Sequence, residues 1–148
     1  PRGPGDPTPV TATGPGLTVL IVEDSPEGRD IYATALEAEG FTVLQAEDGA
    51  AGIRVATDTP PDLVVMNVSM PHVNGVDAVE ILKAHPVTEH VPILVVTGHG
   101  STPAVREGAW EAGCDDFLAK PVGPGDLVAA VADCLDENAR RQRTNGQS

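Results

Sequence analysis

The sequence predicts an α/β fold in which a doubly wound parallel sheet of five strands is covered by five helices. Short apolar runs rich in β-branched residues alternate with longer helical patterns along the chain. The strand runs are almost continuously apolar rather than alternating, which is typical of a parallel sheet that helices cover on both faces. Because crossovers are right-handed and the loops are short, a doubly wound arrangement is the natural solution.

The predicted elements follow one another in a regular order. The first strand, at residues 17–22, leads into Ser25 and Pro26, which suit the N-cap and first turn of a helix. That helix is expected to stop at Gly40, a natural C′ residue. The other strands are expected at residues 41–45, 62–66, 92–96 and 116–119, and the other helices at residues 49–57, 75–84, 103–112 and from about 124 onward.

Length and composition bound the domain. The chain has 148 residues, of which 41% are apolar and 21% charged, and this suits one globular domain with a core of ordinary size. Residues 1–16 are rich in Pro, Gly and Thr and are expected to be disordered. The domain is expected over residues 17–137, followed by a disordered polar tail at residues 138–148.

The net charge of −13 excludes several classes of partner. Nucleic-acid phosphates and anionic lipids would be repelled, so neither nucleic acid nor a membrane surface is expected to bind this domain. No apolar run is long enough to span a bilayer, and a cytoplasmic location is expected. Cys114 and Cys134 are not at metal-ligand spacing and are expected to be small buried apolar residues.

Polar residues stand where the predicted strands end. Glu23 and Asp24 follow the first strand, Asn67 the third, Thr97 the fourth and Lys120 the fifth. In open α/β sheets functional groups gather outside the carboxyl ends of the strands. The convergence of four separate segments on one edge therefore predicts a functional site there.

The chemistry of these residues suits a phosphoryl group beside a divalent cation. Glu23 and Asp24 offer carboxylate oxygens, which Mg²⁺ prefers. Lys120 is a compact cation able to pair with a phosphoryl oxygen, and Thr97 offers a hydroxyl donor. Each of these residues alone occurs often on protein surfaces, so the prediction depends on their joint placement.

Four segments carry a resemblance to a known family: VLIVEDSPEGRDIYATALEAEGF, DLVVMNVSMPHVNGVD, PILVVTGHG and AGCDDFLAKP. Over about residues 17–137 they resemble the response-regulator receiver domains of two-component and phosphorelay signalling. The resemblance implies a flavodoxin-like sheet with the strand order 2-1-3-4-5.

The resemblance also implies a reaction. Family receivers catalyse phosphoryl transfer from a phosphohistidine or a small phosphodonor to an aspartate, and the position of that phosphoacceptor falls on Asn67 here. Mg²⁺ is expected at Asp24, at position 67 and at the carbonyl of Ser69, with Glu23 as the neighbouring acid.

Further roles follow from the same resemblance. Thr97 and Lys120 match the hydroxyl and the lysine that contact the phosphoryl oxygens. Thr97 and Phe117 match the residues of the family's conformational switch. The peptide bond between Lys120 and Pro121 is expected to be cis, a state of modest cost before proline.

Asn67 departs from the family pattern. An amide oxygen is a much poorer nucleophile than a carboxylate, so no acyl phosphate is expected and the family's enzymatic activity is expected to be lost. Mg²⁺ binding is expected to weaken by roughly tenfold or more, if at least ~1.4 kcal/mol of attraction is lost.

Two functions remain open. The chain is either a receiver held unphosphorylated by Asn67, or a natural pseudo-receiver that acts as a phosphorylation-independent interaction module. The completeness of the other site residues favours a blocked, otherwise active receiver. A nucleotide or flavin binder is disfavoured because no glycine-rich phosphate loop follows a strand.

The expected partners are proteins: a histidine kinase or phosphotransfer protein, a downstream target, and a second copy in a homodimer. The expected output surface is formed by the helix at residues 103–112, the strand at residues 116–119 and the helix from about 124 onward.

Overall fold

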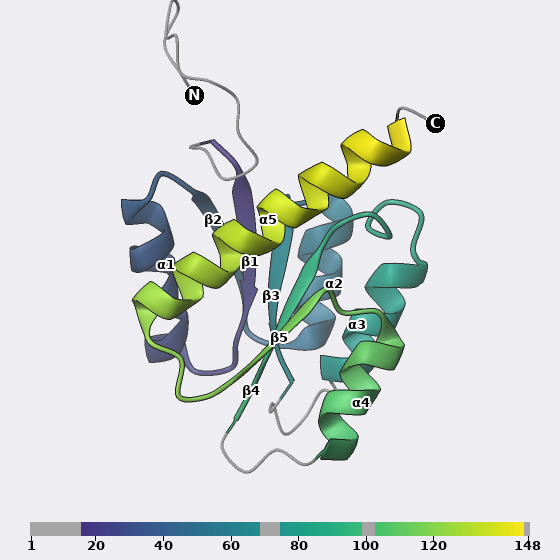
Figure 1. Ribbon diagram of the computed structural model, residues 1–148. Helices are drawn as coiled ribbons and strands as arrows, with labels where there is room; N and C mark the ends of the chain where they lie inside the picture. The colour runs from purple at the N-terminus through teal and green to yellow at the C-terminus, as the bar shows by residue number, and fades with distance from the viewer. Residues whose placement is uncertain (1–15, 69–74, 99–102, 147–148) are drawn as a thin grey trace, which may run out of the picture.

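The computed structural model describes residues 16–68, 75–98 and 103–146. Within these residues one parallel sheet has the order β2-β1-β3-β4-β5 (Figure 1), which confirms the predicted doubly wound fold. Its elements are β1 (Thr18–Val22), α1 (Pro26–Ala38), β2 (Thr42–Ala46), α2 (Gly49–Asp58), β3 (Leu63–Asn67), α3 (Gly75–Ala84), β4 (Ile93–Thr97), α4 (Pro103–Ala112), β5 (Asp116–Ala119) and α5 (Pro124–Gly146).

Two apolar layers cover the two faces of the sheet. Alternate side chains of each strand point to opposite faces, so Val19 and Ile21 join one layer while Leu20 and Val22 join the other. Helices α1 and α5 complete the first layer, and α2, α3 and α4 complete the second. Figure 1 shows α5 crossing the viewer's side of the sheet. Because helices cover both faces of the sheet, a ligand can reach the strands only at their ends.

The ends of α1 follow the predicted capping pattern. The Ser25 hydroxyl accepts a hydrogen bond from the Gly28 N–H at 3.2 Å, which satisfies one of the free donors of the first turn. Gly40 has a φ of 96°, a conformation that glycine adopts without the steric cost of a Cβ. Both signals were readable from the residue types alone.

Helix α5 is longer than predicted. The polar composition after Glu137 led to the expectation of a loose tail, but the helix continues to Gly146. Arg141 Nη2 donates a hydrogen bond to Asp115 Oδ1 at 3.4 Å, and Arg141 Nη1 lies 3.9 Å from Glu137 Oε2. The expected end near Glu137 is thus corrected, because composition does not reveal that side-chain pairs hold the next turn.

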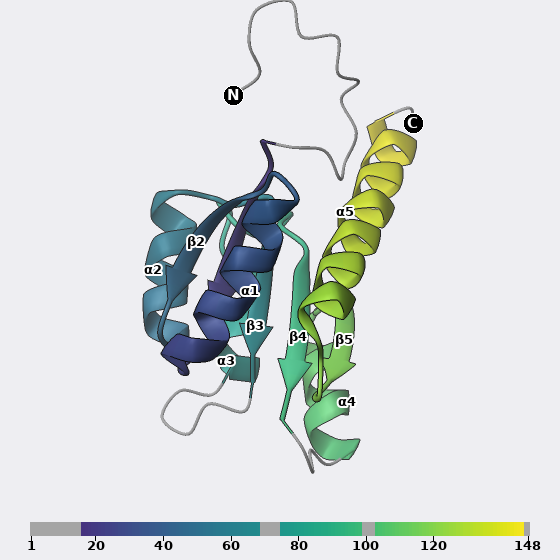
Figure 2. The same ribbon diagram turned by 90° about the vertical axis from the view of Figure 1, so that its left-hand side faces the viewer.

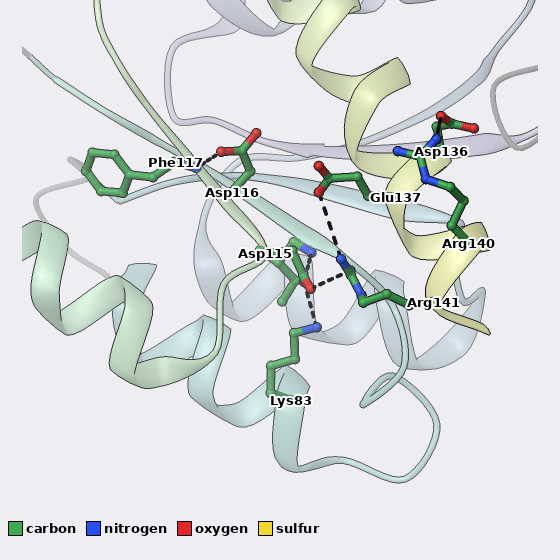
Figure 3. Close-up of polar contacts among 9 residues, drawn as sticks. Lys83, Asp115, Asp116, Phe117, Asp136, Glu137, Arg140 and Arg141 are labelled. Atoms are coloured by element: carbon green, nitrogen blue, oxygen red, sulfur yellow. Dashed lines mark hydrogen bonds and ion pairs between the residues drawn. The ribbon is translucent and has the colours of Figure 1, made fainter. Parts of the chain in front are cut away.

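Asp115 joins three elements at the amino-terminal edge of the sheet (Figure 3). Its Oδ2 accepts hydrogen bonds from Lys83 Nζ and from the Ile93 N–H, both at 2.8 Å, while Oδ1 faces Arg141. We call Lys83, Asp115 and Arg141 the Asp115 cluster. It ties α3 and the end of α5 to the starts of β4 and β5.

Three further expectations concern the rest of the chain. Cys114 and Cys134 are both buried, as predicted, and both are free thiols. Of residues 1–16, for which disorder is expected, only Gly16 is described, and its N–H bonds the Gly40 carbonyl at 3.1 Å. Ser69 also lies outside the described residues. Among the residues that the structure describes, no helix is both long enough and apolar enough to cross a membrane.

Candidate functional site

The polar strand-end residues meet at one edge of the sheet. The arrowheads of β3, β4 and β5 in Figure 2 lie at this edge. Glu23 directly follows β1, Asn67 ends β3, Thr97 ends β4 and Lys120 directly follows β5. Glu23 and Asn67 are each 4% exposed and Thr97 is 1% exposed, which is unusual for polar side chains. Burial of this kind requires that the polar atoms find partners.

The Glu23 carboxylate accepts hydrogen bonds from Asn67, Ser25 and Lys120. Its Oε2 accepts hydrogen bonds from Asn67 Nδ2 at 2.9 Å and from the Ser25 N–H at 3.1 Å. Its Oε1 accepts from Lys120 Nζ at 3.2 Å. We call Glu23, Asn67 and Lys120 the Glu23 cluster. Asn67 and Lys120 are 44 and 97 positions from Glu23 in the sequence, so only the parallel sheet brings them together.

The orientation of the Asn67 amide follows from the same contact. A carboxylate accepts hydrogen bonds and cannot donate them when ionised. If the amide were turned over, Asn67 Oδ1 would face Glu23 Oε2, and two acceptor oxygens would repel each other. Asn67 therefore presents N–H groups, not an oxygen, to Glu23.

The pKa values of the neighbouring acids Glu23 and Asp24 are shifted in opposite directions. Burial raises the pKa of Glu23, but hydrogen bonds with Asp24 and the Ser25 N–H, together with the Lys120 charge, outweigh burial and leave that pKa lowered. The pKa of Asp24 is raised, first by its hydrogen bond with Glu23 and then by burial and the Glu23 charge. Glu23 therefore stays ionised in its buried position, and the Glu23 charge makes ionisation of exposed Asp24 less favourable.

Arg29 is a contact that the sequence reasoning missed. Its Nη1 donates a hydrogen bond to the carbonyl oxygen of Glu23 at 2.7 Å. The backbone N–H of Arg29 bonds the Ser25 carbonyl at 2.9 Å, which places Arg29 in the first turn of α1 above the end of β1. The sequence feature that could have predicted this contact is a long basic side chain one turn after the N-cap Ser25.

The backbone near Asn67 depends on Gly75, the first residue of α3. A Cβ at position 75 would lie 2.6 Å from the Val68 Cα and 2.8 Å from the Asn67 carbonyl oxygen. Real Cβ contacts of this length with backbone are essentially never observed. Glycine therefore lets α3 start against the end of β3.

The segment that carries Lys120 is fixed from two sides. The Lys120 N–H bonds the Thr97 carbonyl at 2.8 Å, which extends the β4–β5 pairing beyond the strand. The Tyr32 hydroxyl donates to the Val122 carbonyl at 3.1 Å and so ties this segment to α1. The Lys120–Pro121 peptide bond is cis, the configuration that the resemblance implies.

Phe117 and Thr97 lie on neighbouring strands, two register positions apart. Phe117 pairs in register with Val95, is half-buried and packs against the layer of α2, α3 and α4. The Arg106 guanidinium of α4 lies 5.3 Å from the centre of its ring. The Thr97 hydroxyl lies 3.5 Å from the Gly98 carbonyl. Their expected role as a switch stays a prediction.

The described donor set does not fit a divalent cation in this arrangement. Both oxygens of Glu23 already accept hydrogen bonds from N–H groups, and Asn67 turns its NH₂ rather than its oxygen toward them. Mg²⁺ prefers oxygen ligands in near-octahedral geometry. No group of three or more His, Cys, Asp or Glu able to hold a metal occurs in residues 16–68, 75–98 and 103–146.

Comparison with known proteins gives consistent matches. A family model described as the response regulator receiver domain matches residues 19–132. The phosphate regulon transcriptional regulatory protein PhoB of Pseudomonas aeruginosa is 35% identical over 116 residues, which are 78% of this chain and 50% of that protein. The chain thus spans about half the length of the curated relatives that it matches.

Solved structures agree with this match. A putative response regulator from Chloroflexus aurantiacus superposes with a TM-score of 0.74 at 30% identity, covering 80% of this chain and 97% of that one. The receiver domain of the sensor histidine kinase PA1611 from Pseudomonas aeruginosa has a TM-score of 0.73 at 28% identity, covering 81% and 98%. That structure is described as having a magnesium ion coordinated in its active site cleft.

Proposed function

Because the chain belongs to the response regulator receiver family, we propose that it is a two-component receiver in which Asn67 occupies the phosphoacceptor position and prevents phosphorylation. The observation that carries the proposal is the placement of Asn67. It ends β3, is buried, and bonds Glu23 beside Lys120, at the edge where the family's chemistry takes place. Such a receiver would signal by binding other proteins in the cytoplasm.

The amide blocks the reaction for a chemical reason. Phosphoryl transfer to a receiver requires a carboxylate oxygen that attacks phosphorus and then carries the phosphoryl group as an acyl phosphate. The nitrogen lone pair of an amide is delocalised into the carbonyl, and here the NH₂ group also donates to Glu23. Asn67 has no group that performs this attack, so the chain does not act as an enzyme.

The remaining site residues keep the roles that the family assigns to their positions. Lys120 and Thr97 would contact phosphoryl oxygens, and in a chain with aspartate at position 67, Asp24 and Ser69 would serve as ligands for Mg²⁺. When bound, Mg²⁺ neutralises phosphoryl charge. We propose that Asn67 weakens this binding, because an amide lacks the full charge of the aspartate it replaces.

The output surface is proposed to be the face of α4, β5 and α5. Trp110 on α4 is 48% exposed, although large aromatic side chains are usually well buried. Arg106 covers the half-buried ring of Phe117 on the same face. An exposed aromatic four positions after a basic side chain on the same helix suits a protein partner. A histidine kinase or phosphotransfer protein, a downstream target, and a second copy in a homodimer are the proposed partners.

The alternative is a natural pseudo-receiver that binds its partner without any phosphoryl chemistry. The observation that favours it is the internal pairing of the Glu23 cluster, which leaves the buried carboxylate satisfied. The two functions differ in whether restoring an aspartate restores the reaction.

Labelling with radioactive acetyl phosphate in the presence and absence of Mg²⁺ tests the proposal. Asn67→Asp should be labelled only with Mg²⁺, and the unaltered chain should not be labelled. Asn138→Asp adds the same charge on the C-terminal half of α5 and should stay unlabelled. Absence of label in Asn67→Asp would exclude a blocked receiver and favour the pseudo-receiver. In the labelled variant, a change in Trp110 fluorescence would report a response at α4.

A further inference from the structure

We propose that the Asn67 amide replaces the cation of this site, so that the folded chain needs no divalent metal and gains no stability from one. The inference deepens the proposed function and rests on it, since it concerns the regulation of the same site. In this arrangement Asn67 does more than remove a nucleophile. Its NH₂ group donates a hydrogen bond to Glu23 at the position where an aspartate would place a second negative charge.

The first step is the saturation of Glu23. The side chain of Glu23 is 5% exposed, so water does not satisfy its oxygens. Oε2 accepts from Asn67 Nδ2 and the Ser25 N–H, and Oε1 accepts from Lys120 Nζ. No buried side-chain polar atom lacks a partner in the described part of the chain. A cation entering here would have to displace donors that are already in place.

The second step concerns Lys120. Its ammonium is partly exposed, with 27% of the side chain accessible, yet it lies 3.2 Å from the buried Glu23 carboxylate. The Lys120 ammonium therefore balances the charge of the Glu23 carboxylate. Because Asn67 also bonds Glu23, the carboxylate is held in place without a bound ligand.

The third step is the comparison with aspartate at position 67. An aspartate oxygen in the place of Asn67 Nδ2 would face Glu23 Oε2 at about 2.9 Å, where two charged acceptors repel each other. Asp24 would add a third carboxylate nearby. Such a set requires a proton or a cation, whereas the asparagine form requires neither. Metal dependence should then appear with the aspartate and be absent with the asparagine.

Thermal unfolding followed by far-UV circular dichroism tests this at constant ionic strength. Between zero and about 10 mM MgCl₂, the unaltered chain should change its Tm by less than about 1 °C. Asn67→Asp should gain about 3–8 °C, as a site filled well above its dissociation constant would produce. Asn138→Asp is the matched control and should behave like the unaltered chain.

A Tm rise in the unaltered chain equal to that of Asn67→Asp would overturn the inference, and so would the absence of a rise in both. If Asn67→Asp does not fold, NMR of the unaltered chain decides. The Asn67 side-chain NH₂ signals should keep their shifts through the same MgCl₂ titration, and their displacement would overturn the inference. These outcomes are independent of phosphodonor labelling, which tests the proposed function.

Discussion

Lys120 and Glu23 form an ion pair across the carboxyl-terminal edge of the sheet, with 3.2 Å between Nζ and Oε1. One partner follows β1 and the other follows β5, so three strand pairings lie between them. The pair therefore depends on the pairing of four strands, from β1 to β5, as well as on the site itself. Asn67 bonds the second Glu23 oxygen and joins β3 to the same unit.

Glu23→Gln should lower the free energy of unfolding by about 1–3 kcal/mol, because the substitution leaves a buried donor without an acceptor. Glutamine keeps one acceptor oxygen, while its NH₂ must face either Lys120 or Asn67, which are themselves donors. Urea unfolding at neutral pH measures the loss. Glu39→Gln, at the exposed C-cap of α1, is the control and should stay within about 0.5 kcal/mol.

The contribution of Glu23 should depend on pH in a defined direction. Its pKa is lowered in the folded chain from the value of 4.5 that is usual for a glutamate, so its stabilising contribution is present above pH 4.5. The contribution is lost as the pH falls through the lowered pKa. The stability difference between the unaltered chain and Glu23→Gln should thus shrink in acid. A difference that grows as the pH falls would contradict the assignment.

Asp24 should show the opposite sign. Its pKa is raised in the folded chain above the value of 3.8 that is usual for an aspartate, so ionised Asp24 costs stability at neutral pH. Asp24→Asn should stabilise the chain at pH 7 by about 0.2–1 kcal/mol, a small gain because the side chain is exposed and screened. Unfolding curves should show this gain disappearing as the pH falls below 3.8, where the carboxyl is protonated in both states. No gain at pH 7, or a gain that persists below pH 3.8, would contradict the raised pKa of Asp24.

Gly75→Ala should destabilise the chain by at least about 2 kcal/mol, since the added methyl overlaps backbone atoms that cannot turn away. Gly125→Ala provides the matched control on α5. A Cβ there meets nothing within 4 Å, so the higher helix propensity of alanine should be neutral or stabilising. Equal losses in the two variants would show that the contact at Gly75 is not the cause.

Arg141→Ala should loosen the end of α5 without unfolding the domain. Its loss removes the contact with Asp115 and should cost about 0.2–1 kcal/mol, because the arginine is exposed. Hydrogen exchange of the amides in residues 138–146 should become faster. Arg140→Ala, which removes the pair with Asp136 on the same helix, should have a smaller effect on exchange.

The two cysteines should react slowly with thiol reagents in the folded chain. Burial, followed by the charges of Asp115 and Asp116, raises the pKa of Cys114 to about 11 and that of Cys134 to about 12. Because the thiolate is the reactive form, modification at pH 8 should be at least ~100-fold slower than in the chain unfolded by urea. Rapid modification of the native chain would contradict their burial.

The sequence was sufficient for the fold and for the positions of the main site residues. Apolar runs predict strands buried on both faces, and parallel strands bring Glu23, Asn67 and Lys120 to one edge whatever their side-chain conformations. Strand order followed from the family resemblance. These predictions depend on residue types and chain order alone.

The orientation of side chains could not be predicted from residue types and chain order. The sequence reasoning considered position 67 as a metal contact, but the structure turns the Asn67 NH₂ group to Glu23. Arg29 was missed because its bond to the Glu23 carbonyl depends on the path of the backbone at the start of α1. The end of α5 was placed too early because Arg141 bonds a residue 26 positions away. The orientation of Asn67 and the end of α5 depend on tertiary contacts that local composition does not encode, whereas the Arg29 contact depends on local backbone geometry.

The exposure of Trp110 decides which signals are informative in these experiments. It is the single tryptophan of the chain, and its side chain is 48% exposed in the folded state. Unfolding therefore changes its surroundings less than it would for a buried indole, and intrinsic emission is a poor measure of global stability. Binding of a protein at α4 would instead remove the indole from water. A blue shift of emission on mixing would then identify a partner without any added dye.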